Sequence, residues 1–296
     1  MQDNKNGLII IDKPEGMTSF DVVRQIRRLA QTRKVGHTGT LDPDATGVLP
    51  IALGQCTKLS KFLVLDEKEY HFTMKLGAST DTDDASGEVI REAPWEEIEE
   101  GAVEEQLTNF VGVIDQVPPI YSAIKIDGKR AYELARAGEE VVLDARKVEV
   151  FELELVEWNP PLASLVVRCG PGTYVRSLAR DLGEVLGSAA HTVSIRRTRV
   201  GSFSVAGAVE LEGLSRETFW EQVKSPLEMV SSLPQIEVNE EQEQRVRNGQ
   251  PVRADLALGI GDALAAHDGE GRLVAVMRCK AVAEGCAEVW PKRVLS

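Results

Sequence analysis

Apolar residues along the chain recur in patterns that predict a mixture of strands and helices. Residues 8–11 form a short, β-branched apolar run that is typical of a buried strand. In residues 70–76 every second side chain is aromatic or aliphatic, which is the period of a half-buried strand. Further strands are expected over residues 148–155 and 165–169.

Apolar residues at helical spacing predict helices between these strands. One helix should begin at Ser19, whose hydroxyl can cap it. Its apolar positions are Val22, Val23, Ile26, Leu29 and Ala30. A second helix is expected over residues 175–186. Strands and helices in irregular order indicate an α+β fold.

The composition and the hydrophobic pattern of the chain change near residue 233, where we expect a domain boundary. A chain of 296 residues is longer than one compact core usually organises. Beyond Pro234 the sequence holds many glycines, short β-like runs and one helical segment at residues 240–247. These features predict a larger domain over residues 1–233 and a small β-rich domain over residues 234–296.

The formal net charge of −13 and the pI near 4.9, taken alone, argue against a polyanionic partner. The distribution of charge is uneven, however, because acidic residues dominate between Asp83 and Glu105. Two other segments are basic, and they contain Lys13, Arg24, Arg27, Arg28, Arg33 and Lys34, and Arg168, Arg176, Arg180, Arg196, Arg197 and Arg199. Phosphates respond to charges within about 8 Å in physiological salt, so a local basic surface could still bind RNA. Either cluster alone is more typical of a solvated helix face.

Several common classes of function can be set aside. The first residues are polar, and no apolar run reaches the roughly 18 residues of a membrane helix, so we expect a cytoplasmic protein with no membrane attachment. The sequence has no phosphate-binding loop, no dinucleotide fingerprint, and no His or Cys cluster at metal-ligand spacing. Residues 81–92 place acids partly as a calcium loop does, but they lack its glycine and its fifth-position ligand. We therefore expect neither a metal nor a cofactor.

Candidate catalytic residues are densest in residues 36–50. The glycines and prolines of this segment permit or fix unusual backbone shapes. Asp42 precedes Pro43, which favours an extended backbone and displays the carboxylate from a loop. Asp42, Pro43 and Asp44 are also typical of a type I turn in which Asp42 bonds its own backbone, and local spacing alone favours that turn.

Residues 36–49 read Gly-His-Thr-Gly-Thr-Leu-Asp-Pro-Asp-Ala-Thr-Gly-Val-Leu, which resembles the catalytic motif of the tRNA pseudouridine synthases of the TruB type. Other motifs of that family are matched in order at residues 12–19, 68–70, 81–87, 116–132, 172–178 and 195–197. Two stretches of the tail more weakly resemble the small PUA-type RNA-binding domain; they are residues 247–252 and 291–294. The resemblance implies a pseudouridine-synthase catalytic domain around a mixed, largely antiparallel sheet, followed by a PUA-like domain.

Members of this family convert uridine to pseudouridine, so the resemblance implies an isomerase that acts at nucleotide 55 in the T loop of tRNA. The base leaves its glycosidic bond, turns and rejoins the ribose through C5, which needs no metal or cofactor. Asp42 is implied as the catalytic carboxylate, acting as nucleophile or proton acceptor. Arg176 is implied to pair with Asp42 and to lower its pKa, typically by about 1 to 3 units.

The target uridine must leave the stacked RNA loop, and the resemblance implies how a pocket receives it. Tyr70 is expected to stack on the base, Tyr174 to lie near C5, and Ile195 to line the pocket. His37 is expected to help fill the space that the base vacates. An RNA-gripping insertion is implied over about residues 116–145, and phosphate contacts are expected from Lys13, Lys58, Lys125, Lys129 and Arg130.

Two positions depart from the family pattern, and three alternative functions stay open. Asp44 stands where an apolar residue is more usual and could repel RNA or raise the pKa of Asp42, while Gly170 and Pro171 stand where a basic residue is usual. The protein could chiefly anneal tRNA, or it could be an RNA-guided relative that works with partner proteins. The insertion argues against a guide RNA, and we expect a monomer whose partner is the T arm of tRNA. A carboxylate glycosidase is the last alternative, with no second well-placed acid beyond Asp44.

Overall fold

The computed structural model describes residues 5–64, 66–283 and 286–295, and the chain divides into two compact units. The first unit comprises Met1–Pro43, Leu49–Val64 and Ala206–Ser296, and the second comprises Asp44–Val48 and Leu65–Val205. Strand β3 runs through both units. Within the described residues, no helix is both long and apolar enough to cross a membrane.

Strand β4 (Lys68–Leu76) occupies the centre of the sheet of the second unit. It pairs antiparallel with β11 (Leu162–Cys169) on one side and with β12 (Ala190–Val200) on the other. Antiparallel pairing continues from β11 to β10 (Arg146–Asn159) and from β10 to β7 (Gly112–Gln116). The first residues of β3 pair with β12 in parallel. The prediction of a mixed, largely antiparallel sheet is therefore confirmed.

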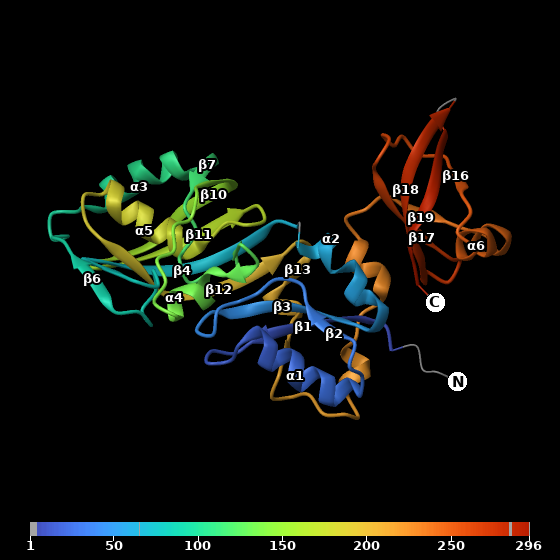
Figure 1. The fold of residues 1–296 in the computed structure, drawn as a ribbon, viewed down its shortest axis with the longest axis horizontal. Helices are drawn as coiled ribbons and strands as arrows, with labels where there is room; N and C mark the ends of the chain where they lie inside the picture. Colours follow the sequence, from blue (N-terminus) through green and yellow to red (C-terminus); the bar gives the residue numbers. More distant parts are fainter. Residues whose placement is uncertain (1–4, 65, 284–285, 296) are drawn as a thin grey trace. The chain divides into compact units, whose positions relative to one another are not determined.

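The alternation predicted for residues 70–76 is present in β4, where Tyr70, Phe72, Met74 and Leu76 are buried and the residues between them are more exposed. Two helices cover the sheet on one face (Figure 1). Helix α5 (Val175–Val185) packs on β12 and β4, and α3 (Glu100–Leu107) packs on β10. The smaller strands of this unit are β5 (Ala78–Thr80), β6 (Val89–Glu92) and β13 (Phe203–Ser204).

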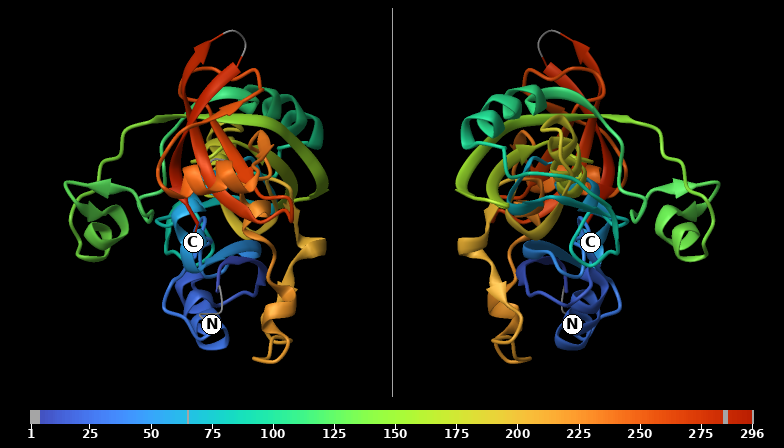
Figure 2. Two further views of the ribbon diagram at one scale, coloured as in Figure 1. Left: turned by 90° about the vertical axis from the view of Figure 1, so that its right-hand side faces the viewer. Right: turned by 90° about the vertical axis from the view of Figure 1, so that its left-hand side faces the viewer.

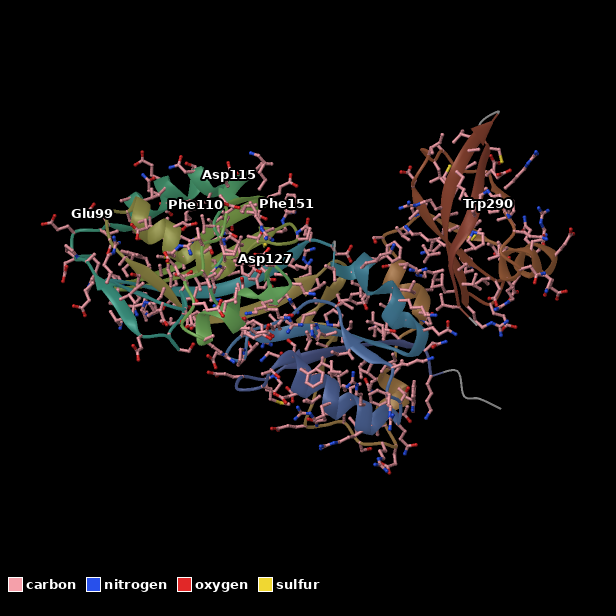
Figure 3. All side chains as sticks on the ribbon, in the orientation of Figure 1. Glu99, Phe110, Asp115, Asp127, Phe151 and Trp290 are labelled. Atoms are coloured by element: carbon pink, nitrogen blue, oxygen red, sulfur yellow. The ribbon has the colours of Figure 1, made fainter. Side chains whose placement is uncertain are left out.

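A separate arm lies between β7 and β10 and is defined here as residues 117–145. It contains the hairpin of β8 (Lys125–Ile126) and β9 (Lys129–Arg130), followed by helix α4 (Ala131–Arg136). Figure 2 shows the arm extending away from the remainder of the second unit. Asp127, labelled in Figure 3, occupies the turn of the hairpin with φ of +50°. The sequence predicts an insertion at this place.

The first unit begins with β1 (Gly7–Lys13), in which the predicted strand is completely buried. Helix α1 (Ser19–Ala30) follows, but its cap is Thr18, whose Oγ1 accepts from the Asp21 N–H at 3.1 Å. The expectation that Ser19 caps this helix is therefore wrong. The remaining elements of this part are β2 (Val35–His37), β3 (Thr46–Leu53), α2 (Ser60–Val64) and β14 (Val209–Glu210).

The C-terminal part of the chain forms its own five-stranded sheet in the order β15-β17-β18-β19-β16. Its elements are β15 (Gln235–Glu237), α6 (Glu240–Arg247), β16 (Val252–Ala254), β17 (Ala263–His267), β18 (Leu273–Ala283) and β19 (Cys286–Val294). It also has its own core, in which Val246 of α6 packs with Leu264 and Met277 of the sheet. This curled β-rich domain agrees with the predicted fold class, and the boundary near residue 233 stays a prediction.

Gly47 is held against β12 so closely that it accepts no side chain. Its φ is +100°, and a Cβ there would lie 2.1 Å from the carbonyl oxygen of Arg197. Gly47→Ala should therefore lower the free energy of unfolding by about 2 to 5 kcal/mol, measured by urea denaturation. Gly101→Ala is the matched control, because Gly101 lies in α3 with nothing near its missing Cβ. Equal stability of the two variants would contradict this reading of Gly47.

Candidate active site

The candidate site residues are distributed over both units. The first unit holds Asp42, His37, Lys13 and Lys58. The second unit holds Tyr70, Tyr174, Arg176 and Ile195, together with the three cationic residues of the arm. Each group has local supports that can be followed bond by bond within its own unit.

Asp42 is half-buried, and both of its neighbours are held by buried polar groups. The Leu41 N–H donates to Ser19 Oγ at 2.8 Å, and the Leu41 carbonyl accepts from the same hydroxyl at 3.0 Å. The Pro43 carbonyl accepts from Lys13 Nζ at 2.9 Å and from the Gly16 N–H at 3.0 Å. The carboxylate is therefore carried by a backbone that is fixed on both sides, as a preorganised catalytic group requires.

Lys13 supports this loop from inside the protein. Its side chain is 0% exposed, and Nζ donates to the carbonyl oxygens of Pro14 at 2.8 Å, Met17 at 2.6 Å and Pro43 at 2.9 Å. The expectation that Lys13 contacts a phosphate is wrong, because its charged end points away from solvent. It instead ties the turn that follows β1 to the loop that carries Asp42.

Lys13→Met should disconnect the two segments while keeping a side chain of similar length. Three carbonyl oxygens would each lose a donor, so the free energy of unfolding should fall by about 2 kcal/mol. The rate of the predicted isomerisation of uridine should fall at least about tenfold, since Pro43 is no longer fixed beside Asp42. Urea denaturation and turnover measure the two effects, and Lys75→Met on an exposed position of β4 is the control. An unchanged rate in Lys13→Met would show that the loop needs no such support.

Tyr70 and Ile195 lie on neighbouring strands in the second unit. Tyr70 is opposite Arg197, and Phe72 is opposite Ile195, in the pairing of β4 with β12. Tyr70 and Ile195 are thus diagonal neighbours, with Cα atoms about 7 Å apart. Tyr70 is 9% exposed and Ile195 is half-buried. The structure brings these two predicted pocket residues together.

Arg197, opposite Tyr70, is a buried structural residue, whereas the sequence placed it in a basic cluster and in the family motif at residues 195–197 without a role. It is 2% exposed, and its Nε donates to the Val48 carbonyl at 2.7 Å. This bond joins β12 to the β3 segment that follows the Asp42 loop. Nothing in the run from Arg196 to Arg199 distinguishes the buried arginine from its more exposed neighbours.

Arg176 is clamped by two segments that are remote in sequence. Its Nη1 donates to the Thr82 carbonyl at 2.8 Å and pairs with Asp84 Oδ2 at 3.3 Å. Its Nη2 donates to the Tyr121 carbonyl at 3.0 Å, and the side chain is only 5% exposed. An ordinary surface arginine is therefore excluded for Arg176. Its predicted pairing with Asp42 stays a prediction.

Tyr174 occupies the N-cap position of α5, and its backbone is held by Gln116. The Tyr174 N–H donates to Gln116 Oε1 at 2.8 Å, and Gln116 Nε2 donates back to the Tyr174 carbonyl at 3.1 Å. Gln116 is 1% exposed, so this paired bond is shielded from water. Gln116 and Asp84 both belong to family motifs of the sequence, which give neither residue a role. Membership of those motifs is the only feature of the sequence that points to these two residues. Their bonding partners lie more than 50 residues away, so local spacing does not reveal the contacts.

Lys68, which opens β4 two residues before Tyr70, has an unusual environment. Its side chain is 8% exposed, and Nζ donates to the Asp66 carbonyl. Burial lowers the pKa of Lys68 to about 8, with a further contribution from the nearby positive charge of Arg197. The fold therefore carries a buried ammonium that loses its proton more readily than a free lysine.

The lowered pKa of Lys68 predicts a specific dependence of stability on pH. Between pH 8 and the unfolded value of about 10.4, the unfolded chain binds more protons than the folded chain, so stability should rise with pH. The slope cannot exceed about 1.4 kcal/mol per pH unit for one group. Comparing urea denaturation of the native protein and of Lys68→Met at pH 7 and pH 10 isolates this contribution. Parallel pH profiles would contradict the assignment.

Two arginines of the second basic cluster, Arg168 and Arg199, form ion pairs with glutamates of the same unit. Arg168 lies 3.2 Å from Glu67 and 3.0 Å from Glu152, and Arg199 lies 2.7 Å from Glu67. Burial raises the pKa of Glu67, but its hydrogen bonds with Arg199 and Arg168 outweigh burial and hold the pKa below its ordinary value. These positive charges are thus largely offset within the second unit.

The other predicted phosphate contacts are exposed cations. Lys58 in the first unit and Lys125, Lys129 and Arg130 on the arm all face solvent. Lys129 has an exposed ion pair with Glu139 at 3.5 Å, a contact that contributes little in water. These four side chains can reach a phosphate, and their contact with RNA stays a prediction.

The part of the chain that the structure describes has no group of three or more His, Cys, Asp or Glu side chains that could hold a metal ion. In residues 81–87 the acids bond to the loop and to the arginines of α5: Asp84 Oδ1 accepts from Ser86 Oγ at 2.6 Å, Asp81 Oδ1 accepts from the Glu88 N–H at 2.9 Å, and Asp83 pairs with Arg180. Burial raises the pKa of Cys56 to about 12 and that of Cys169 to about 11. Both thiols therefore stay protonated and unreactive at neutral pH.

Two solved structures share this fold over nearly the whole chain. The first, a Cbf5-Nop10-Gar1 complex, matches with a TM-score of 0.76 and 27% identity, covering 98% of this chain and 85% of that one. The second, the archaeal box H/ACA sRNP Nop10-Cbf5 complex, matches with a TM-score of 0.76 and 25% identity, covering 99% and 87%. Together with the family match and the named sequence relatives, this fold defines a pseudouridine synthase, which is an isomerase.

Sequence relatives give the family. The family described as TruB family pseudouridylate synthase (N terminal domain) matches residues 27–175, and the tRNA pseudouridylate synthase B C-terminal domain matches residues 176–231. The tRNA pseudouridine synthase B of Clostridium tetani is 43% identical over 84% of this chain and 86% of its own. That of Thermobifida fusca is 50% identical over 72% and 75%, and that of Geobacter sulfurreducens is 39% identical over 96% and 95%. The chain belongs to the TruB family, and the predicted resemblance is confirmed.

Proposed function

We propose that this protein isomerises uridine to pseudouridine at nucleotide 55 in the T loop of tRNA, as a cytoplasmic monomer without cofactor, metal or guide RNA. Its relatives named tRNA pseudouridine synthase B support tRNA as the substrate. The observation that carries the proposal is the loop of Asp42, in which Ser19 fixes Leu41 and Lys13 fixes Pro43. A turn that served only to reverse the chain would not need buried polar groups on both sides of its carboxylate.

Asp42 supplies the carboxylate for breaking and remaking the glycosidic bond. The bond from N1 to C1′ breaks, a bond from C5 to C1′ forms, and the proton that leaves C5 is balanced by one gained at N1. Asp42 acts at the sugar or base as nucleophile or proton acceptor, and Tyr174 lies near C5 to assist the proton transfer. No atom is gained or lost, so the residues of the chain suffice.

Tyr70 receives the uridine after it leaves the RNA stack. A base stacked on an aromatic face gains about 1 to 3 kcal/mol, which helps to offset the cost of flipping. Tyr70 projects from a central strand whose register is fixed on both sides, and Ile195 is its diagonal neighbour. A stacking face on a rigid strand is positioned more accurately than one on a loop.

RNA binding is supported by where the exposed cations lie, although the protein as a whole is acidic. The arm carries Lys125, Lys129 and Arg130 at its surface. In the first unit, a surface cavity of about 330 Å³ on α1 is lined by Arg24, Arg27, Arg28, Gln31, Thr32 and Arg33. Both surfaces suit a phosphate backbone, because local charge rather than net charge attracts it at physiological salt.

Asp42→Asn should abolish the reaction while leaving the fold and RNA binding intact. The amide has the same size but cannot act as nucleophile or proton acceptor, so the rate should fall at least about 1,000-fold. The measurement is tritium release from C5-labelled uridine in tRNA, with pseudouridine mapped at nucleotide 55. Asp44→Asn is the matched control and should keep the normal rate or exceed it. Normal tritium release by Asp42→Asn would refute the mechanism.

The exposed cations of the arm also suit a protein that chiefly anneals tRNA, and the same variants separate the two functions. If annealing is the main activity, Asp42→Asn should refold tRNA as well as the native protein and keep the cellular phenotype. Neutralising Lys125 and Lys129 should then abolish both the refolding of tRNA and the cellular phenotype. Activity of the purified protein on a bare tRNA transcript tests the absence of a guide RNA.

A further inference from the structure

Helix α5 presents a second arginine, Arg180, one turn beyond Arg176. Residues four apart lie on the same side of a helix, so the two guanidinium groups face the same neighbours. Arg176 bonds to the loop of residues 81–87 and to the arm. Arg180 bonds to the same two segments, and the proposed mechanism assigns it no role.

All three nitrogen atoms of the Arg180 guanidinium have a bonding partner. Its Nη1 pairs with Asp83 Oδ2 at 2.8 Å, and Nη2 donates to the Val117 carbonyl at 2.8 Å. Its Nε donates to Asp181 Oδ1 at 2.8 Å on its own helix. A planar fork with three partners in fixed directions sets the distances among them, which a lysine could not do.

Asp83 is held in a conformation that aspartate adopts rarely. Its φ is +60°, and it is 7% exposed. Its carbonyl accepts from the Thr192 N–H at 3.1 Å, so β12 fixes the backbone while Arg180 fixes the side chain. The residues on either side, Thr82 and Asp84, are those that bond Arg176. A shift of Asp83 therefore moves the acceptors of Arg176 with it.

The root of the arm is held by the same helix. The Val117 carbonyl accepts from both Arg180 Nη2 and Ser177 Oγ, each at 2.8 Å. Gln116 clasps the backbone of Tyr174, and the Tyr121 carbonyl accepts from Arg176. Beyond this root the arm carries its exposed cations. A displacement of the arm on binding RNA is therefore transmitted to α5 through these hydrogen bonds.

We propose that Arg180 is a positioning residue that holds the arm root and the loop of residues 81–87 in register with Arg176. It thereby couples the grip of the arm on RNA to the alignment of the candidate catalytic arginine. This inference rests on the proposed function and on the predicted pairing of Arg176 with Asp42. Arg180 itself touches neither substrate nor reacting atoms.

Arg180→Met tests the coupling, because it keeps the bulk of the side chain but removes all three bonds. The single-turnover rate of pseudouridine formation with saturating tRNA transcript should fall about 10- to 100-fold, as expected for a misplaced catalytic group. The Kd for tRNA should stay within about threefold, since the exposed cations of the arm are unchanged. Arg180→Lys keeps the ion pair with Asp83 and should recover part of the rate. Asp83→Asn should show a smaller loss, because asparagine tolerates the same backbone.

Arg91→Gln is the matched control. Arg91 pairs with Glu184 on the same helix at 2.8 Å but contacts neither the arm nor the loop of residues 81–87. Its removal should leave the single-turnover rate within about twofold even if the melting temperature falls. A purely structural role for Arg180 predicts that both variants lose stability and neither loses rate.

Amide hydrogen exchange gives a readout that does not depend on activity. The amides of Val117, Ile120, Tyr121 and Ser122 should exchange faster in Arg180→Met than in the native protein or in Arg91→Gln, because the Val117 carbonyl loses one of its two donors and the arm root is held less firmly. Unchanged exchange, or an unchanged single-turnover rate in a folded Arg180→Met, overturns the proposal. If Arg180→Met does not fold, Arg180→Lys and Asp83→Asn decide it by the same measurements. If the native protein forms no pseudouridine in tRNA, the proposed function fails, and exchange alone decides whether Arg180 holds the arm root.

Discussion

The bond from the buried Lys13 ammonium to the Pro43 carbonyl is the constraint on which the placement of Asp42 depends. The segment from Thr38 to Ala45 has no regular secondary structure, so no backbone ladder fixes it. Ordering each such residue costs about 1 to 2 kcal/mol, and side chains from elsewhere must offset it. Burying an ammonium is itself unfavourable, which is why Lys13 needs three carbonyl partners.

Burial divides the arginines and lysines of this acidic chain into two populations. Arg176 and Arg197 lie inside the second unit, and Arg168 and Arg199 are engaged with nearby glutamates, where they join segments. The cations of the arm face solvent, as do Arg24 and Arg28 of α1. A net charge of −13 is therefore compatible with RNA binding, since the dense run of acids between Asp83 and Glu105 belongs to a different segment of the chain from these cations.

Periodicity along the chain predicted several elements, among them β1, β4, β10, β11, α1 and α5, but contacts between distant residues were not accessible from it. The alternation in β4 and the helix after Thr18 follow from spacing, because each buries one face. Thr18 and Ser19 are adjacent hydroxyls, and only the contact of Ser19 with Leu41, 22 residues away, decides which one caps the helix. Lys13 looked like a surface cation because its carbonyl partners carry no sequence signature. The family motifs identified Asp42, Tyr70 and Arg176, but not the side chains that hold them.

Lys13 and Arg176 share one chemical feature, which is that each bonds mainly to backbone carbonyl oxygens. Lys13 uses Pro14, Met17 and Pro43, and Arg176 uses Thr82 and Tyr121. Carbonyl oxygens do not titrate, and arginine keeps its proton at any physiological pH, so these bonds persist across the range in which carboxylates change charge. A support built only from carboxylates would weaken as they gained protons. The geometry around Asp42 and Arg176 is therefore set independently of the protonation changes that the reaction itself requires.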